Sequence, residues 1–474
     1  MGILMAGGIF TGASPAVGPA ELARQLKDSG ALFLIAGSAG LQVALEAASH
    51  SSLSKGRVFS FDGSLQGATI PSQAGVNHWT TILADATEAE RFDWVEPLDP
   101  RSTTCCLNYS SGTTGIPKGV EITHHAYVAN GQVNVHINHM DPSWHEQLKT
   151  RSSLCFMPMY HAAGQTTFVA NHPKMLIPTY IMPRYNFEKL LQHIQDFKIT
   201  SIATAPPILL SIAKSPLTAK YNLSSVKEIV CGTAPLPPEI AQTVQRKLWP
   251  NGESFVRQGW GMTEFTCTGS LWSYGDDEKP SSVGEIVPNA SLKIMDGDSE
   301  ITVPNQPGEL WITGPTLMKG YWQNPGATAE TIAEEKGVRW LKTGDIAYVD
   351  RFKPGAKIFL TDRIKELIKV RGFQVSPAEL EATLLTYGSV VDAGVVGVVI
   401  NGEEVPRAYV VRNSDVTEQE IEKWMEGQVA KYKWLRGGVV FVDSIPRIQS
   451  GKILRRVLRE MAKREVVGTK AKLA

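Results

Sequence analysis

The sequence predicts an α/β protein of two domains: a large N-terminal domain built on covered, largely parallel sheets, and a small α+β C-terminal domain. Its 474 residues exceed the ~250–300 at which one hydrophobic core usually stops growing. Helical and apolar extended segments alternate through most of the chain, as they do in βαβ units. Near Asp362 the pattern changes to short strands and capped helices. We therefore expect domains at 1–361 and 362–474.

The alternation of helix and strand is clearest at three places in the first domain. Glu21–Ser29 has the periodicity of a helix. Gly30 suits the left-handed position that often ends a helix, and the apolar run Ala31–Ala36 predicts a strand. The alternation recurs in two further pairs, helix Leu190–Phe197 with strand Thr200–Thr204 and strand Val226–Cys231 with helix Glu239–Leu248.

The C-terminal segment carries recognisable helix starts. Ser376 and Glu379 predict a capping box around Pro377, and Thr417 with Glu420 predicts a second. From residue 362 onward 19 basic residues stand against 15 acidic ones, compared with 28 against 32 before it, which suits a lid that handles anions. A basic helix is expected at the end, preceded by strands Phe373–Val375, Val395–Ile400, Ala408–Val411 and Val439–Val442 and by a helix with Ile421, Trp424, Met425 and Val429 on one face.

Composition excludes several classes of function. With 47 Lys and Arg against 47 Asp and Glu, the chain lacks the basic excess of a general nucleic-acid binder, so no nucleic-acid partner is expected. Hydrophobic residues make up 43% and charged residues 20%, which is typical of a globular rather than a disordered chain. No stretch reaches the ~18 apolar residues that span a bilayer, so no integral membrane association is expected.

Cysteine usage favours a cytoplasmic location. The five cysteines contain no CxxC pair and no spacing with histidine typical of zinc. Scattered free cysteines fit a reducing compartment, and Cys105 and Cys106 are expected to be small buried residues in a strand. The tripeptide Ala471-Lys472-Leu473 resembles a peroxisomal signal, but Ala474 follows it, so that signal is imperfect.

The strongest chemical signal is a run of glycines, hydroxyl residues and a lysine at positions 109–120. Glycines let the backbone approach an anion, hydroxyls donate to phosphate oxygens and Lys118 supplies positive charge. The motif is not Walker A, because Pro117 precedes the lysine, Gly119 follows it, and 120–122 reads as a strand. The alternative is an ordinary glycine-serine turn. The residues expected to bind phosphate here are Ser110, Ser111, Gly112, Thr113, Thr114, Gly115 and Lys118.

This loop resembles that of the adenylate-forming superfamily, which includes acyl-CoA synthetases, peptide-synthetase adenylation domains and luciferases. The segment Asp362–Lys369, running into Gly372-Phe373-Gln374, resembles the same family. Further motifs follow in the family's order, so the resemblance covers essentially the whole chain. The greatest similarity is to 4-coumarate–CoA ligases and related acyl-CoA ligases. It implies a carboxylic acid–CoA ligase that uses ATP, Mg²⁺ and CoA, takes a small-molecule acid and forms an acyl-adenylate.

The resemblance also implies the rest of the nucleotide site. In the motif Gln258–Glu264, Thr263 contacts the α-phosphate, Trp260 (commonly Tyr in the family) stacks near adenine, and Glu264 helps to hold magnesium, a hard cation that prefers oxygen ligands. Taken alone, Thr263 and Glu264 could be a helix cap. Asp345 accepts hydrogen bonds from the ribose hydroxyls. The residues assigned to nucleotide outside the first loop are Thr233, Gln258, Gly259, Trp260, Thr263, Asp345, Arg363 and Lys452.

Lys452 is the expected catalytic residue, together with Thr263 and His161. Its segment Pro446–Lys452 resembles the family's C-terminal catalytic segment. A carboxylate that attacks the α-phosphate brings two anions together, so a cation aimed at the developing charge is needed. The ordinary interpretation is a solvated lysine at the start of a basic helix, and only the motif overturns it.

Two further groups of residues follow from the resemblance. His161 matches the family's histidine near the acyl pocket, although a lone histidine is more often a core or surface residue. Ala163 stands where plant hydroxycinnamate ligases carry a tyrosine, which puts coumarate specificity in doubt. The expected acyl pocket is His161, Ala163, Thr167 and Gly232, and the positions near CoA are Arg184, Lys369, Arg371 and Gly372.

Several alternatives share these motifs. An adenylating enzyme with another acceptor, either a carrier-protein thiol or the oxygen chemistry of luciferases, would perform the same first step. The opening residues resemble an internal segment of these ligases, so the usual N-terminal segment is expected to be missing, and a truncated homologue that only binds nucleotide is a further alternative. The acid stays open among aryl, phenylpropanoid and medium-chain aliphatic compounds.

Overall fold

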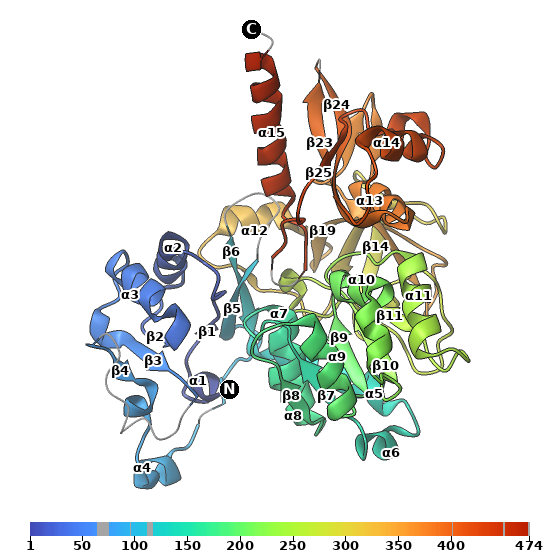
Figure 1. The fold of residues 1–474 in the computed structure, drawn as a ribbon. Coiled ribbons are helices and arrows are strands. Elements are labelled where there is room, and N and C mark those ends of the chain that lie inside the picture. The colour runs from blue at the N-terminus through green and yellow to red at the C-terminus, as the bar shows by residue number, and fades with distance from the viewer. Residues whose placement is uncertain (64–74, 95, 111–116, 401, 449–450, 473–474) are drawn as a thin grey trace. The chain divides into compact units, whose positions relative to one another are not determined.

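The computed structural model describes residues 1–63, 75–94, 96–110, 117–400, 402–448 and 451–472 (Figure 1). The chain divides into two compact units. The first comprises Met1–Ala129, Tyr160–Ala162 and Thr316–Glu330, and the second comprises Asn130–Met159, Ala163–Pro315 and Thr331–Ala474. The expected boundary at Asp362 lies inside the second unit, and the division into domains 1–361 and 362–474 stays a prediction. Every helix among the described residues is too short or too polar to cross a bilayer.

The first unit contains two sheets. In the sheet β1-β5-β6-β17, β1 runs parallel to β5 and the other pairs are antiparallel. The sheet β2-β3-β4 is parallel, and helices α2 and α3 share its hydrophobic core. The elements are α1 Gly2–Met5, β1 Phe10–Thr11, α2 Pro19–Ser29, β2 Leu34–Gly37, α3 Leu41–Ser49, β3 Val58–Phe61, β4 Asn77–His78, α4 Ala86–Arg91, β5 Thr104–Ser110, β6 Lys118–Thr123 and β17 Gly320–Tyr321; α5 His124–His139 and α12 Pro325–Thr331 begin here.

The helix and the strand predicted at the start of this unit are both present, but α2 begins at Pro19 rather than Glu21 and β2 ends at Gly37 rather than Ala36. Helix α2 ends at Ser29, and Gly30 has a left-handed φ of 65°. Strand β2 begins at Leu34 rather than Ala31, because the amide of Ala31 still bonds back to the carbonyl of Leu26 and closes the helix. Cys105 and Cys106 are each 1% exposed within β5, as expected for small apolar residues.

The second unit contains a parallel sheet of order β11-β10-β9-β7-β8. Leu190, Leu191 and Ile194 form the apolar face of α9, and all three are fully buried in one core with residues of α10 and α11. The covered parallel sheet that the alternating pattern predicts is therefore present. Its elements are α6 Trp144–Leu148, β7 Ser153–Cys155, α7 Ala162–Gly164, α8 His172–Lys174, β8 Thr179–Ile181, α9 Phe187–Asp196, β9 Ser201–Thr204, α10 Pro206–Lys214, β10 Glu228–Cys231, α11 Pro238–Leu248 and β11 Val256–Gln258.

An antiparallel sheet of order β15-β14-β16-β19-β18, with β20 paired to β19, follows in the same unit. Its longest strand, β19, places Asp345 opposite Arg363 of β20. Its strands are β14 Ser291–Asp296, β15 Ser299–Ile301, β16 Gly308–Thr313, β18 Ile332–Glu335, β19 Val338–Val349 and β20 Ile358–Arg363. Two short strands, β12 Ser270–Leu271 and β13 Glu285–Ile286, pair antiparallel in a separate sheet.

The C-terminal segment 362–474 packs helices on the sheet β23-β24-β25. Strand β22 has the predicted bounds, whereas β23 begins at Val390, five residues earlier than expected. Val429, expected on the face of the second helix, lies beyond that helix, although it packs against the same core. The elements are β21 Ile368–Val370, β22 Phe373–Val375, α13 Pro377–Thr386, β23 Val390–Ile400, β24 Glu403–Arg412, α14 Glu418–Glu426, β25 Val439–Phe441 and α15 Arg455–Lys472.

The two predicted capping boxes differ. Thr417 and Glu420 satisfy each other's backbone amides, so this box is complete. Ser376 accepts from the amide of Glu379, but the carboxylate of Glu379 binds the ammonium of Lys433 at 2.5 Å. An ion pair is a stronger partner for that carboxylate than an exposed backbone amide.

Replacing Thr417 by alanine is expected to loosen α14 locally. Loss of the cap costs ~1 kcal/mol, which corresponds to amide hydrogen exchange in α14 that is about fivefold faster. Hydrogen-exchange mass spectrometry measures this change. Thr386→Ala, at the exposed end of α13, serves as the control and should leave α14 unchanged; equal exchange in the two variants would contradict a stabilising cap.

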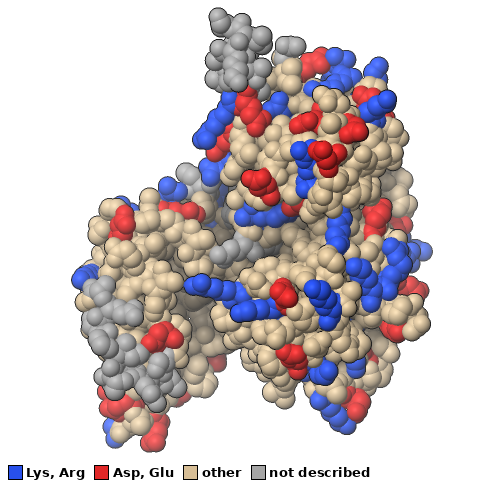
Figure 2. Space-filling view, viewed as in Figure 1, with Lys and Arg blue, Asp and Glu red and all other residues tan. Residues whose placement is uncertain are grey.

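Charged side chains of both signs mix on the face of the molecule that Figure 2 shows. Basic and acidic residues are equally numerous in the chain, with 47 of each.

Candidate active site

The carboxyl ends of the parallel strands place several predicted residues at one edge of the sheet. Gly232 and Thr233 follow β10, and Gly259 and Trp260 follow β11. The amide of Gly232 bonds to the carbonyl of Thr204, and the amide of Gly259 bonds to that of Cys231, which continues the ladder beyond the strand ends. In open α/β sheets this edge is where ligands bind.

Asp345 is the centre of a buried polar cluster. Its side chain is 5% exposed; one carboxylate oxygen pairs with Nε of Arg363 at 2.7 Å, and the other accepts a hydrogen bond from Nε1 of Trp260 at 2.8 Å. The antiparallel register of β19 and β20 brings the arginine opposite the aspartate. A carboxylate offers about four acceptor positions, so two remain on Asp345 for a ligand's hydroxyl groups.

Glu264 and Lys452 lie close enough to this cluster to interact electrostatically with it. Asp345 is the main reason that the pKa of Arg363 is raised, and Glu264 raises it further. Burial lowers the pKa of Lys452 to about 8, and the positive charge of Arg363 adds to that effect, while Asp345 opposes it. Trp260, Glu264, Asp345, Arg363 and Lys452, which are up to 192 positions apart in the sequence, therefore share one site.

The loop that carries Lys452 is held by its own backbone and by one arginine. Arg447 donates to the carbonyl of Gly451 at 2.7 Å, and the amide of Ile448 donates to the carbonyl of Lys452 at 3.0 Å. Gly451 has a φ of 89°, a conformation that favours glycine. Two motif residues, Gln449 and Ser450, lie outside the described residues.

Gln258, Thr233 and Thr263 take different positions around the same strand end. The side-chain oxygen of Gln258 accepts from the amide of Leu236 at 2.8 Å, which ties β11 to the loop after β10. Thr233 in that loop has a φ of 76°, a strained conformation for threonine that is common at functional sites. Thr263 is the first residue of a single 3₁₀ turn, and the capping position of that turn is Met262. Thr263 is therefore not a helix cap.

The predicted phosphate loop is described only at its two ends. Ser110 and Lys118 face each other across the β5–β6 hairpin of the first unit, and the ammonium of Lys118 lies 4.8 Å from the centre of the Tyr321 ring. The expected strand at 120–122 is confirmed. The loop residues Ser111, Gly112, Thr113, Thr114 and Gly115 lie outside the described residues.

Thr167, one of the residues assigned to the acyl pocket, belongs to an unusual helix. Ala163 belongs to the short helix α7, and Thr167 lies in the π-helical turn Gln165–Asn171 that follows it. Such turns occur frequently at functional sites. A Cβ on Gly164 would lie 2.1 Å from the carbonyl oxygen of Pro158, so glycine is required there. His161 belongs to the first unit.

The residues assigned to CoA lie on exposed parts of the second unit. Arg184 is exposed after β8. Arg371 and Gly372, with positive φ of 49° and 86°, form the two-residue turn of the β21–β22 hairpin. The guanidinium of Arg371 pairs with Glu403 at 2.8 Å, with both side chains largely exposed. Lys369 lies on the exposed side of β21.

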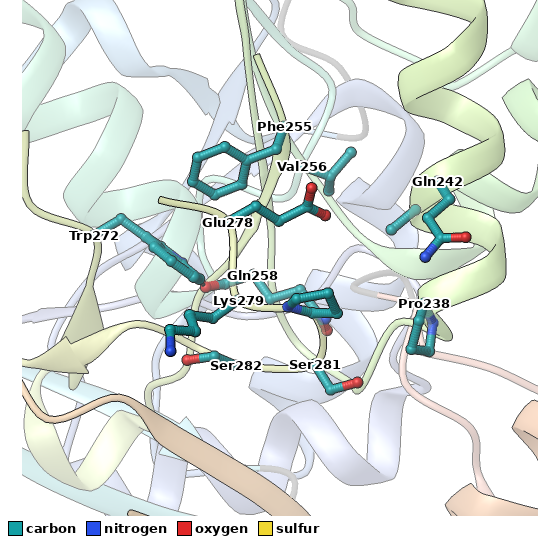
Figure 3. A pocket seen from close by; sticks show the side chains of 12 residues that line it. Pro238, Gln242, Phe255, Val256, Gln258, Trp272, Glu278, Lys279, Ser281 and Ser282 are labelled. Atoms are coloured by element: carbon teal, nitrogen blue, oxygen red, sulfur yellow. Dashed lines mark hydrogen bonds between the residues drawn. The ribbon is translucent and has the colours of Figure 1, made fainter. Parts of the chain in front are cut away.

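Two hollows elsewhere in the second unit do not contain this cluster. A cavity between α11 and the loop 278–282, lined by Gln258 and Trp272 among others, holds about 10 Å³ (Figure 3), which is room for about one water molecule. An open groove of about 690 Å³ is lined by residues just before β11, including Trp249 and Phe255, by Arg257 within that strand and by the segment 274–278. It therefore lies at the amino end of that strand, away from the edge that binds ligands in such sheets.

A buried ionic network behind Lys452 was missed by sequence reasoning. Arg455 pairs with Glu366 at 3.1 Å and with Glu381 at 2.8 Å, and all three side chains are 10–12% exposed. It joins the turn after Asp362 to α13 and to the start of α15. The signal in the sequence was a glutamate at the otherwise apolar position 381 of α13, but three charges far apart along a chain do not reveal their partners.

The described residues contain no cluster of three or more side chains that could hold a metal ion unaided. Glu264 is 9% exposed and lies near Arg363. A single carboxylate suits a magnesium ion whose other ligands come from nucleotide phosphates and water, so the residues present fit that ion.

Family models identify this chain. The model of the AMP-binding enzyme matches residues 1–322, and that of the AMP-binding enzyme C-terminal domain matches residues 379–452. The chain belongs to the AMP-binding enzymes, and its homologues are AMP-forming acid–thiol ligases. An acyl-CoA synthetase of Alternaria alternata is 37% identical over 98% of this chain and 78% of that protein. A 4-coumarate–CoA ligase of Pinus taeda is 37% identical over 97% of this chain and 81% of that protein.

Solved structures share the fold. The anthranilate CoA ligase AuaEII, in complex with anthranoyl-AMP, has a TM-score of 0.80 and 22% identity, over 98% of this chain and 85% of that one. ATP-bound MatB from Rhodopseudomonas palustris has a TM-score of 0.77 and 24% identity, over 97% and 85%. The predicted α/β fold, with a large part built on a parallel sheet and a smaller C-terminal part, is confirmed.

Proposed function

We propose that this chain is a magnesium- and ATP-dependent carboxylic acid–CoA ligase that acts through an acyl-adenylate. The observation that carries the proposal is the buried cluster of Asp345, Arg363 and Trp260 beside Lys452. It offers acceptors for ribose hydroxyls and two cations for phosphate at the carboxyl edge of a parallel sheet. The names of the relatives, an acyl-CoA synthetase and a 4-coumarate–CoA ligase, support the same chemistry.

In the first step a carboxylate oxygen of the acid bonds to the α-phosphorus of ATP, and the bond from that phosphorus to the bridging oxygen breaks. Acyl-AMP forms and pyrophosphate leaves. Lys452 stabilises the negative charge that grows on the α-phosphate, and Thr263 donates a hydrogen bond to it. Glu264, together with phosphate oxygens, would hold a magnesium ion, which would supply positive charge to offset that of the triphosphate.

In the second step the sulfur of CoA bonds to the acyl carbon, AMP leaves and the thiol gives up its proton. The two steps need different groups at one site, which a hinged lid can supply. We assign the lid to residues 362–474, its hinge to Asp362, the CoA-facing residues to Arg184 and 369–372, and the acyl pocket to His161, Ala163, Thr167 and Gly232. Free cysteines, four of them buried, support a cytoplasmic location.

Two assays separate this proposal from its alternatives. Exchange of labelled pyrophosphate into ATP is measured with 4-coumarate, phenylacetate, benzoate and hexanoate, and CoA thioesters are then detected by mass spectrometry. Acid-dependent exchange with thioester formation supports the ligase. Exchange without thioester favours another acceptor, and no exchange with any acid, despite ATP binding, favours a homologue that only binds nucleotide.

The pH dependence of adenylation provides a further test. Lys452 must be protonated to stabilise the α-phosphate, and its pKa in the free protein is about 8. We expect kcat/KM for ATP to fall as pH rises through about 8, because this parameter reports the free enzyme. The guanidinium of Lys452→Arg stays charged, so the residual kcat/KM of this variant should not fall as pH rises through about 8. If kcat/KM of the arginine variant falls over the same pH range, the titrating group is not Lys452.

A further inference from the structure

Lys214, the last residue of α10, joins the body of the second unit to the lid. Its ammonium donates to the carbonyl of Leu385 at 3.1 Å and to that of Val390 at 2.6 Å. These carbonyls lie at the end of α13 and the start of β23, and Figure 1 draws α13 next to α10. Burial of the ammonium lowers the pKa of Lys214, and the negative charge of Asp392 opposes that effect.

The contacts continue from this point to Lys452. Asp392, two residues after Val390 on β23, accepts from Arg447 at 2.8 Å, and the side chains are 22% and 20% exposed. The same guanidinium donates through its other nitrogen to the carbonyl of Gly451 at 2.7 Å. Because Lys452 is the next residue, a short chain of bonds connects Lys214 to the catalytic loop.

The opposite end of α10 also contacts the lid. A Cβ built on Gly451 would lie 3.0 Å from the Cβ of Ala205, the residue that precedes α10, and 3.3 Å from Pro207 in its first turn. Helix α10 therefore supports the lid at both ends: the catalytic loop rests on its start, and Lys214 holds the α13–β23 connection at its end.

We propose that Lys214 is a positioning residue that latches the lid in the orientation for adenylate formation. This inference rests on the proposed function. Both acceptors belong to the lid, so the two hydrogen bonds exist only while the lid occupies this orientation. When the lid rotates for thioester formation, the ammonium returns to water. An interaction present in one state alone shifts the equilibrium toward that state.

The chain offers a matched control. Lys247 of α11 donates to the carbonyls of Ile212 and Ala213 at 3.3 and 2.8 Å. It thus makes the same kind of bonds to the same helix α10, but both acceptors lie outside the lid. Lys214→Met is expected to slow adenylation about tenfold, which corresponds to ~1.4 kcal/mol. Lys247→Met should change the rates of adenylation and thioester formation by the same factor. Lys214→Arg should restore most of the adenylation rate that Lys214→Met loses.

Two half-reactions and one measurement that needs no catalysis test the latch. Pyrophosphate exchange reports adenylation, and CoA-thioester formation from a synthetic acyl-AMP of the best acid in the panel reports the second step. Hydrogen exchange of 385–392 is measured without ligands. Slower adenylation with an unchanged or faster second step, and faster exchange at 385–392 only in Lys214→Met, would support the latch.

Equal loss of both half-reactions, or no change at 385–392, would overturn it. If the unmodified protein catalyses neither half-reaction, the proposed function fails. The hydrogen-exchange comparison of the two methionine variants would still decide whether Lys214 holds the lid.

Discussion

Replacing Lys452 by alanine is expected to slow adenylate formation by about a hundredfold to a thousandfold, or ~3–4 kcal/mol, the usual cost of losing one group that stabilises transition-state charge. The buried ammonium beside Arg363 is the cation available to the α-phosphate from the lid. Thioester formation from preformed acyl-AMP should change far less, because in that step no bond to phosphorus forms. Pyrophosphate exchange and thioester assays measure the two rates.

Lys463→Ala is the control for this substitution. Lys463 is an exposed lysine on α15, downstream of Lys452 in the same C-terminal segment, and its loss should leave both rates within about twofold, as expected of surface changes. Equal damage to both half-reactions in Lys452→Ala would contradict its assignment to adenylation alone.

Replacing Asp345 by asparagine is expected to lower kcat/KM for ATP by about 150-fold, or ~3 kcal/mol. This is the lower end of the cost of breaking a buried ion pair, because Asp345 is 5% exposed but the side chain of Arg363 is 34% exposed. Asparagine has the same size, but its amide group must turn hydrogens toward either Arg363 or Trp260, both of which are donors. One buried donor then loses its acceptor, and the ribose loses a charged partner. Initial-rate kinetics at varied ATP measures the effect.

Asp350→Asn provides the matched comparison. Asp350 follows the same strand β19 and pairs with Arg351 at 3.4 Å, where the arginine is 50% exposed. An exposed pair contributes little, so ATP kinetics should be nearly unchanged. A similar loss in both variants would mean that the effect of Asp345→Asn comes from the strand rather than from the nucleotide site.

Local signals in the sequence predicted local structure well. The cap at Thr417, the glycine stop at Gly30 and the strand β22 depend on residues within a few positions of one another. Predicted features were wrong where contacts with a neighbouring element determine them. Strand β23 begins before its predicted start because it pairs along its whole length with β24. The carboxylate of Glu379 does not complete the capping box because it pairs with Lys433.

The candidate site was predictable where a motif carries it and hidden where distant charges meet. Motifs indicated Trp260, Asp345 and Lys452, and the structure brings them together. Nothing local to Lys214 reveals that its acceptors are backbone carbonyls more than 170 positions away. Charged groups that pair only in the folded chain produce no periodic pattern in the sequence, so the three-dimensional structure is needed to identify them.

An acid whose carboxylate carries two ¹⁸O atoms would distinguish an acyl-adenylate route to the CoA thioester from any other route. The acid that supports pyrophosphate exchange is incubated with the protein, ATP, magnesium and CoA, and mass spectrometry analyses the products. One carboxylate oxygen becomes the bridge between the acyl carbon and phosphorus, and it leaves with AMP when the CoA sulfur attacks. We therefore expect AMP with one ¹⁸O atom and acyl-CoA with the other. Unlabelled AMP, or ADP in place of AMP, would contradict it.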